Sequence, residues 1–353
     1  MNPAALFSGP LAQALLWTLV HSLWQGAAVA LLAALGLAVL RRHSAALRYR
    51  YLVALALLFA AGTVATFCTL WQLPAKALAA AGTGSVHVSA GAPFVAARSL
   101  AESRWEQVVD FLNAQAPLLL MAWLLFLLVR TGMLVIGYRQ SRRLRHEALE
   151  AVPAAWTARF DELVRAMGIA RPVAFFQSAL VQVPLVVGHL KPVVLVPLGM
   201  CTQLRPDEVQ AILVHELAHI RRHDYLVNAL QHVLELFYFF NPPLMWLSAR
   251  IRREREYCCD DIAVAHAGSP RAYAEALLGY QEAAAGHAFA AAFHGGRRMP
   301  LLDRIQRILS SKHQNLNTME KITLFSGLVA TALVTLAFQA QDGDAPIPLT
   351  APP

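Results

Sequence analysis

Four long apolar stretches restrict what this chain can fold into. They cover about residues 11–40, 51–71, 117–138 and 322–340. A helix needs about 20 apolar residues to cross the hydrocarbon core of a bilayer, so each stretch is long enough to span it. The chain of 353 residues is 57% hydrophobic and only 15% charged, which is more apolar than an ordinary soluble domain. The sequence therefore predicts an integral membrane protein with four transmembrane helices.

The basic residues predict how these helices are oriented. No Lys or Arg precedes Arg41, so the first stretch is expected to be a retained helix and not a signal peptide. Arg and Lys gather beside the predicted spans, and the net charge of +8 is assigned to this topology, so no direct binding of nucleic acid is expected. The positive-inside rule then predicts a membrane region at 1–138 with an extracytoplasmic loop at 72–116, a cytoplasmic domain at 139–321, a fourth span at 322–340 and an extracytoplasmic tail at 341–353.

The polar segment 139–321 has the pattern of a mixed α+β domain. Its predicted elements are a helix at 152–167, strands at 172–176, 180–187 and 192–196, a helix from Arg205 to about Phe240, and a helix from Pro242 to about Ala265. Residues 226–247 are apolar, but the Pro pair inside them favours two helices lying against the membrane over a fifth span. The hairpin at 183–197 is either core structure or an edge strand for an extended peptide. The basic segment 295–312 is expected to contact lipid headgroups.

A short motif on the helix after Arg205 predicts a metal site. His215, Glu216 and His219 form the pattern H-E-x-x-H. Residues four apart on an α-helix lie about 40° apart around its axis, so both imidazoles can reach one ion from the same face. Zinc lowers the pKa of bound water toward neutrality, and Glu216 is placed to take the proton as general base. The spacing predicts Zn²⁺ as cofactor and Glu216 as catalytic residue.

A catalytic zinc of this type needs one more protein ligand, from a second helix. Glu256 is preferred because Asp260 follows four residues later and could hydrogen-bond a ligating histidine. Glu254 is the competing carboxylate, and His223, one turn beyond His219, is a weaker alternative.

Several longer motifs resemble those of the BlaR1/MecR1 family of integral-membrane metallopeptidases, peptidase family M56, and more distantly the Ste24/HtpX proteases. They are HSLWQG at 21–26, VPLVVGHLKPVVLVP at 183–197, LVHELAHIRRHDYL at 213–226, FNPPLMW at 240–246 and EREYCCDDIAV at 254–264. The resemblance implies that His215, His219 and Glu256 bind zinc and that Glu216 is the general base. It also suggests a supporting role for Asp224 at the end of the active helix. The fold it implies is a four-span membrane protein with an inserted cytoplasmic, zincin-like α+β domain.

The resemblance further implies a zinc metalloendopeptidase, gluzincin-like, in a bacterial cytoplasmic membrane. Its expected substrate is a cytoplasmic protein or peptide such as a transcriptional repressor, and cleavage of itself is a second expectation. Partners besides the bilayer would be a second copy of the chain or a separate sensor protein.

One departure from the resemblance limits the functional expectation. Antibiotic-sensing members carry a penicillin-binding domain with an S-x-x-K motif after the last span, whereas this sequence is expected to lack it and to end in a Pro-rich tail. A β-lactam sensor is therefore not predicted. The alternative function is a non-catalytic membrane signal transducer or scaffold with a structural zinc. Tyr257 and His232 are the candidates for stabilising an oxyanion, and the sequence does not choose between them.

Overall fold

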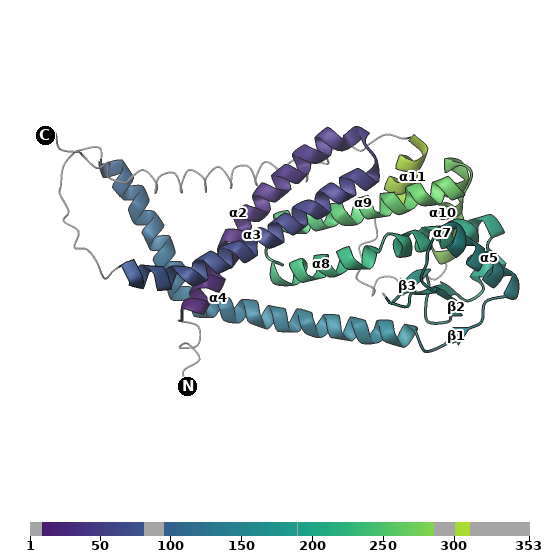
Figure 1. Cartoon of the computed structure of the whole chain (residues 1–353), viewed down its shortest axis with the longest axis horizontal. Helices are drawn as coiled ribbons and strands as arrows, with labels where there is room; N and C mark the ends of the chain where they lie inside the picture. Colours follow the sequence, from purple (N-terminus) through teal and green to yellow (C-terminus); the bar gives the residue numbers. More distant parts are fainter. Residues whose placement is uncertain (1–8, 81–94, 189, 286–300, 311–353) are drawn as a thin grey trace.

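The computed structural model describes residues 9–80, 95–188, 190–285 and 301–310, and it is mostly helical (Figure 1). Helices α2 (Pro10–Val39), α3 (Ala45–Ala80) and α4 (Val95–Leu144) contain the first three predicted spans. By length and composition they are able to cross a membrane over Pro10–Arg42, Ala45–Gln72 and Gln107–Leu144. The predicted fourth span at 322–340 and the tail at 341–353 lie outside the described residues.

Helices α2 and α3 form a hairpin around a short 3-10 turn, η1 (Leu40–Arg42), and lie side by side (Figure 1). A Cβ atom on Gly36 would lie 2.2 Å from the ring of Tyr51, so the two helices approach closely only because residue 36 is glycine. The Tyr51 hydroxyl also donates a hydrogen bond to the Leu32 carbonyl at 2.6 Å. In contrast, α4 exposes large apolar side chains such as Leu125 and Leu128, as expected of a lipid-facing surface.

A four-stranded sheet follows α4 in the order β1–β2–β4–β3. Its strands are β1 (Leu149–Glu150), β2 (Ala174–Ser178), β3 (Leu185–Val187) and β4 (Val193–Pro197). Strands β2 and β4 run parallel, and the two outer strands are antiparallel to their neighbours. The sequence predicted the last three strands within a few residues and missed the two-residue β1. Strand β4 is almost wholly apolar and buried because it lies inside the sheet.

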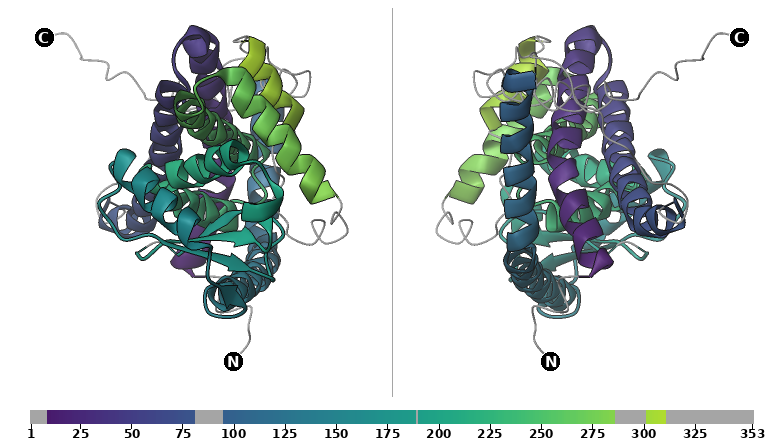
Figure 2. Two further views of the ribbon diagram at one scale, coloured as in Figure 1. Left: turned by 90° about the vertical axis from the view of Figure 1, so that its right-hand side faces the viewer. Right: turned by 90° about the vertical axis from the view of Figure 1, so that its left-hand side faces the viewer.

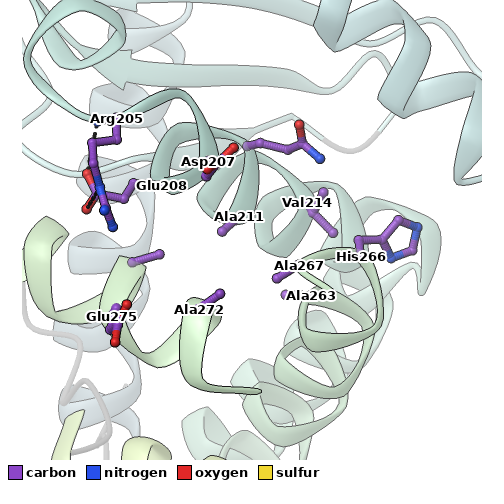
Figure 3. Close-up of a pocket in the computed structure, with 12 residues that line it drawn as sticks. Arg205, Asp207, Glu208, Ala211, Val214, Ala263, His266, Ala267, Ala272 and Glu275 are labelled. Carbon is purple, nitrogen blue, oxygen red and sulfur yellow. Dashed lines mark hydrogen bonds and ion pairs between the residues drawn. The ribbon is translucent and has the colours of Figure 1, made fainter. Parts of the chain in front are cut away.

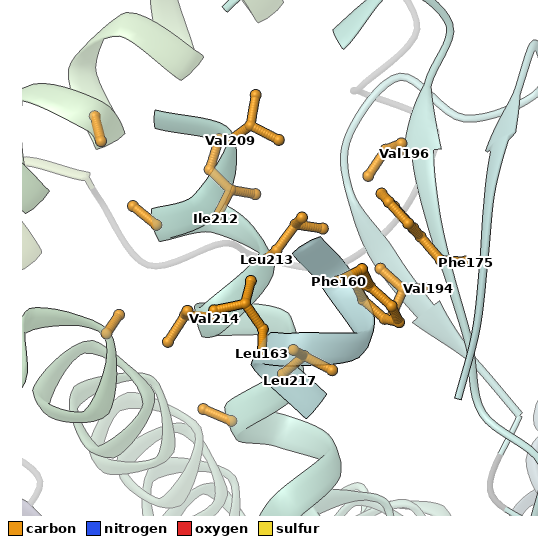
Figure 4. Packing of buried hydrophobic residues seen from close by; sticks show 14 of the residues in the cluster. Phe160, Leu163, Phe175, Val194, Val196, Val209, Ile212, Leu213, Val214 and Leu217 are labelled. Atoms are coloured by element: carbon orange, nitrogen blue, oxygen red, sulfur yellow. The ribbon is translucent and has the colours of Figure 1, made fainter. Parts of the chain in front are cut away.

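One face of the sheet packs on helices α5 (Ala154–Ala166) and α7 (Pro206–Arg221), with the one-turn α6 (Met200–Gln203) between β4 and α7. Figure 4 shows the shared core: side chains of α5 and β2–β4 meet one side of α7. Phe160 of α5 stacks on Phe175 of β2 with ring centroids 4.5 Å apart. The apolar side of α7 is buried in this core, which fixes the direction of its histidines.

The helix predicted from Arg205 to Phe240 is divided in the structure into α7 and α8 (Asp224–Phe237). The break lies at His223, whose φ of 56° is left-handed and ends an α-helix. The Ile220 carbonyl near the end of α7 accepts hydrogen bonds from the His223 amide at 3.2 Å and from Arg171 at 2.6 Å. The break turns Asp224 back toward α7, which a continuous helix would not allow.

Helix α9 (Pro242–His266) links two hydrophobic cores. Its first half packs with α2, α3 and α8 through residues such as Leu247 and Ile251, and its second half packs on α7 through Cys259 and Ala263. Helices α10 (Pro270–Ala285) and α11 (Leu301–Ser310) cover this second half (Figure 2).

The elbow between α8 and α9 packs among all three candidate spans. Asn241 is fully buried and donates to the Ser22 carbonyl in the middle of α2 at 2.7 Å. The backbone carbonyl of Phe237 accepts a hydrogen bond from Trp123 of α4, and Tyr238 packs edge-on against Phe59 of α3. The elbow thus contacts α2, α3 and α4, and the prediction that these two helices lie against the membrane stays a prediction.

Candidate metal centre

Helices α7 and α9 bring the two histidines of the H-E-x-x-H motif to one carboxylate. Ligand atoms of His215, His219 and Glu256 all lie within 4.8 Å of one another. The Nε2 atom of His215 is 3.6 Å from Glu256 Oε2, and that of His219 is 4.0 Å from Glu256 Oε1. Glu216 lies between the histidines on α7 and is half-buried. Both imidazoles thus present the same nitrogen to the carboxylate from the second helix.

The other nitrogen of His219 is held by the first residue of α8. Asp224 Oδ2 lies 2.8 Å from His219 Nδ1, and Asp224 is almost fully buried. A carboxylate only accepts hydrogen bonds, so the neutral imidazole carries its proton on Nδ1 and keeps the Nε2 lone pair for a metal. The thiol of Cys259 lies 3.3 Å from the same Nδ1 and donates to Asp224 Oδ2 at 3.6 Å.

The other nitrogen of His215 faces a buried polar cluster. Its Nδ1 lies 3.4 Å from Asp260 Oδ1 and 3.1 Å from the hydroxyl oxygen of Tyr273, which donates to the same carboxylate oxygen at 2.9 Å. Arg304 of α11 completes the cluster by donating to both oxygens of Asp260. Asp260 and Tyr273 have no exposed surface, so this cluster supports His215 from the protein interior.

These contacts shift the pKa values of the cluster. Burial alone would lower the pKa of His215, but the carboxylates of Asp260 and Glu256 raise it to about 9. Burial would raise the pKa of Glu256, yet the hydrogen bond with His215 and the charge of His219 lower it to about 2. Against the same effect of burial, His215 and Arg304 hold the pKa of Asp260 well below its usual range. The cluster therefore keeps two carboxylates ionised beside the histidines.

The donor set fits a catalytic zinc ion. Two imidazole Nε2 atoms and one carboxylate are a known ligand set for catalytic zinc, and hydrogen bonds from the outer nitrogens of the histidines to carboxylates are usual at such sites. Calcium or magnesium would instead favour oxygen ligands alone. The residues present thus match the zinc predicted from the sequence.

The competing ligands lie elsewhere. Glu254 forms a buried ion pair with Arg48 of α3, at 2.9 Å, and belongs to neither of the metal-ligand groups among the described residues. His223 is exposed, with its ring 6.1 Å from that of Tyr225. His232 is exposed on α8, and the ring of Tyr257 lies under the guanidinium of Arg307 at 4.4 Å.

Sequence analysis missed several residues around the centre. Tyr273 and Arg304 follow Asp260 by 13 and 44 residues and belong to no recognisable motif. Arg48 was assigned to membrane topology, although it is 4% exposed and paired with Glu254. Arg304 and Arg307 were expected at lipid headgroups, but they bind Asp260 and Asp261 of α9. A carboxylate pair, Asp260–Asp261, was the one signal that could have suggested a basic partner.

A cavity of about 250 Å³ lies beside the start of α7, between this helix, the end of α9 and α10 (Figure 3). Glu208 and Glu275 line one side of it and His266 lies at the other, over a floor that includes Ala211 and Ala263. The lining includes none of the residues of the metal centre.

The comparison with known families shows which family the chain belongs to. The sequence model described as BlaR1 peptidase M56 matches residues 17–308, which include most of the first candidate span, the whole of the other two and the candidate metal ligands. The chain belongs to the BlaR1 peptidase M56 family. Its membership in a metallopeptidase family agrees with the resemblance seen in the motifs.

Individual relatives match over shorter segments. The chain is 33% identical over 88 residues to the regulatory protein BlaR1 of Bacillus licheniformis, covering 25% of this chain and 14% of the relative. It is 27% identical over 97 residues to the methicillin resistance mecR1 protein of Staphylococcus aureus, covering 27% and 17%. It is 32% identical over 114 residues to a protease HtpX homolog of Methanopyrus kandleri, covering 25% of this chain and 36% of the relative. The chain therefore spans well under half the length of each of these relatives.

Proposed function

We propose that this M56 family member is a membrane-embedded, zinc-dependent endopeptidase. The observation that carries the proposal is the convergence of His215, His219 and Glu256, with the outer nitrogens of both histidines directed at buried carboxylates. The family and its metallopeptidase chemistry support the same function. A regulatory role is suggested by relatives named regulatory protein BlaR1 and mecR1.

In this proposal the three ligands hold zinc, which when bound supplies Lewis-acid chemistry and lowers the pKa of water. Glu216 takes a proton from the attacking water and passes it to the leaving amine. Asp224 and Asp260 keep each imidazole oriented with Nε2 directed at the metal.

The substrate is proposed to be a cytoplasmic protein, such as a transcriptional repressor, or a second copy of the chain. This follows from the basic residues at the ends of α2 and α4, which the positive-inside rule assigns to the cytoplasmic side together with α7 and α9. Helix α7 and the sheet lie beyond those ends of the spans (Figure 1).

The Glu216→Gln variant tests the proposal in the full chain purified in detergent. We expect it to bind one zinc ion, as the wild type does, and to lose peptide cleavage by at least about 100-fold, because a general base typically contributes about 10²–10⁴-fold. Zinc content and cleavage of a casein substrate are measured side by side. Glu275→Gln, on an exposed part of α10, is the matched control and should cleave normally.

Wild-type protein without zinc would contradict the metal site, and a Glu216→Gln variant that cleaves normally would contradict the mechanism. Zinc binding without cleavage by the wild type toward any protein substrate would favour a scaffold with a structural zinc.

A further inference from the structure

Two adjacent residues at the start of α3 reach the metal centre from the membrane hairpin. Arg48 and Tyr49 are 4% and 8% exposed. Arg48 contacts Glu254 of α9, the helix of Glu256, and Tyr49 contacts Asp224, which lies against His219. They lie at one end of the candidate span Ala45–Gln72. The hairpin thus contacts the centre through buried polar side chains as well as through apolar packing.

The first connection runs from Tyr49 to His219. The Tyr49 hydroxyl donates to Asp224 Oδ1 at 3.4 Å, while the other carboxylate oxygen lies 2.8 Å from His219 Nδ1. Arg222 lies against both partners: its guanidinium is 4.6 Å from the centre of the Tyr49 ring, and its Nε is 3.3 Å from Asp224 Oδ1. Tyr49 of α3 therefore contacts Asp224, and Asp224 in turn orients His219.

The second connection runs from Arg48 to the helix of Glu256. Both Nε and Nη2 of Arg48 lie 2.9 Å from Glu254 Oε2, and the side chains are only 5% and 7% exposed. Glu254 precedes Glu256 by two residues on α9, so this ion pair fixes the part of α9 that presents the third ligand. Removing one member of a buried pair leaves the other charge without compensation.

We infer that Arg48 and Tyr49 are positioning residues of the metal centre, through which the α2–α3 hairpin sets the placement of His219 and Glu256. The inference rests on the proposed zinc site and adds its control by a membrane helix. It assigns the metal affinity of the protein in part to a segment that is about 170 residues away in sequence from the nearest ligand.

Tyr49→Phe is the main test, because it removes only the hydroxyl and leaves the ring under Arg222. Its matched control is Tyr51→Phe on the same helix. The Tyr51 hydroxyl donates to the Leu32 carbonyl of α2, away from the candidate metal ligands. Zinc dissociation constants are measured by competition with a chromophoric chelator, and the visible spectrum of the cobalt-substituted full chain in detergent reports ligand geometry.

We expect Tyr49→Phe to weaken zinc binding about threefold to tenfold, less than the roughly 10–100-fold expected for a residue that hydrogen-bonds a ligand directly. The cobalt spectrum should change as well. Tyr51→Phe should match the wild type in both measurements. Equal affinities and spectra for Tyr49→Phe and wild type would overturn the inference, and so would equal losses in the two variants.

Arg48→Gln tests the second connection, with the exposed neighbour Arg50→Gln as control. We expect weaker zinc binding and a changed cobalt spectrum only for Arg48→Gln, with partial recovery in Arg48→Lys. If Arg48→Gln fails to fold, Arg48→Lys tests the connection alone. A cobalt spectrum and a zinc affinity of Arg48→Lys equal to those of the wild type would contradict the role of the Arg48 guanidinium. Wild-type protein that binds neither zinc nor cobalt would instead refute the proposed function, so the two failures are distinguishable.

Discussion

At the scale of single residues, the choice between two nearby carboxylates shows what determines a ligand. Glu254 and Glu256 lie on the same helix, yet Glu254 faces Arg48 and Glu256 faces the two imidazoles. Residues two apart on a helix lie about 200° apart around its axis, so the two carboxylates face different neighbours. The sequence favoured Glu256, and the partner of Glu254 gives the physical reason.

The environment of His215 predicts how metal binding depends on pH. A ligating imidazole must lose its proton, and in the metal-free protein the pKa of His215 is raised to about 9 by Asp260 and Glu256, against burial. Below this pH one proton must leave His215 for each zinc ion bound. As the pH is lowered from 9 to 7, we therefore expect the protonation of His215 to reduce zinc affinity about tenfold per pH unit.

Competition titrations between pH 7 and pH 9.5 measure this dependence. The variant Asp260→Asn removes a carboxylate that raises the pKa of His215. As the pH is lowered, the zinc affinity of this variant should therefore begin to fall at a lower pH than that of the wild type. An affinity that stays constant across this range in the wild type would contradict the prediction.

At the scale of helices, α11 is attached to α9 by two arginines in different surroundings. Arg304 binds Asp260, which has no exposed side-chain surface, whereas Arg307 binds Asp261, whose side chain is 50% exposed. A buried ion pair that loses one partner costs more than a solvated one.

We expect Arg304→Gln to lower the free energy of unfolding by about 3 kcal/mol, because it leaves a buried carboxylate without its cation. Arg307→Gln is the matched control and should cost no more than about 1 kcal/mol. Denaturation of the two variants in mixed micelles measures the difference. Equal losses would show that Asp260 does not depend on Arg304.

The crossing of α2 with the α8–α9 elbow predicts a steric effect. A Cβ atom on Gly26 would lie 2.5 Å from the side-chain amide of Asn241, which is held by hydrogen bonds to Ser22 and Leu244. Gly26→Ala should therefore destabilise the protein by about 1–3 kcal/mol, as overpacking does in tightly packed interiors.

Gly62→Ala is the control for that change, since a Cβ atom at this helical position meets no atom within 4 Å. We expect it to be neutral or slightly stabilising, and thermal unfolding in detergent compares the two variants. A Gly26→Ala protein as stable as the wild type would mean that the elbow yields to the added methyl group.

The elements that local patterns determine were predictable from the sequence. Helix α7, its histidines and the new helix at Pro242 follow from apolar periodicity, a known motif and the geometry of proline. The break at His223 was not predictable, because it depends on the contact between Asp224 and His219 across the turn. Arg48 was assigned only to membrane topology, because a count of basic residues beside a span does not reveal which of them form buried ion pairs, as Arg48 does with Glu254.

At the scale of the whole molecule, the candidate metal ligands lie where the candidate spans and the sheet-containing half meet. Helix α9 passes from the elbow among the spans to the core under α7 (Figures 1 and 2). The three candidate spans are shown by length and composition, and their orientation stays a prediction.

Cysteine labelling tests that orientation in membrane vesicles. Cys201, Cys258 and Cys259 are buried and Cys68 is exposed, so a Cys68→Ser background should react little with an impermeant maleimide. We expect Asp161→Cys, on the exposed side of α5, to be labelled only in inverted vesicles. Gln72→Cys, at the C-terminal end of the candidate span Ala45–Gln72, should be labelled only in right-side-out vesicles. The reverse labelling pattern would contradict the predicted topology.

The buried contacts of Arg48 and Tyr49 also bear on how the protein is made. The ribosome synthesises the α2–α3 hairpin before α7, α8 and α9, and segments made first generally fold first. We therefore expect the hairpin to enter the bilayer before the helices that carry the histidines and Glu256 are complete. On the proposed function, we expect a chain whose hairpin missed the membrane to lack both of these contacts to the candidate metal ligands and to bind zinc more weakly.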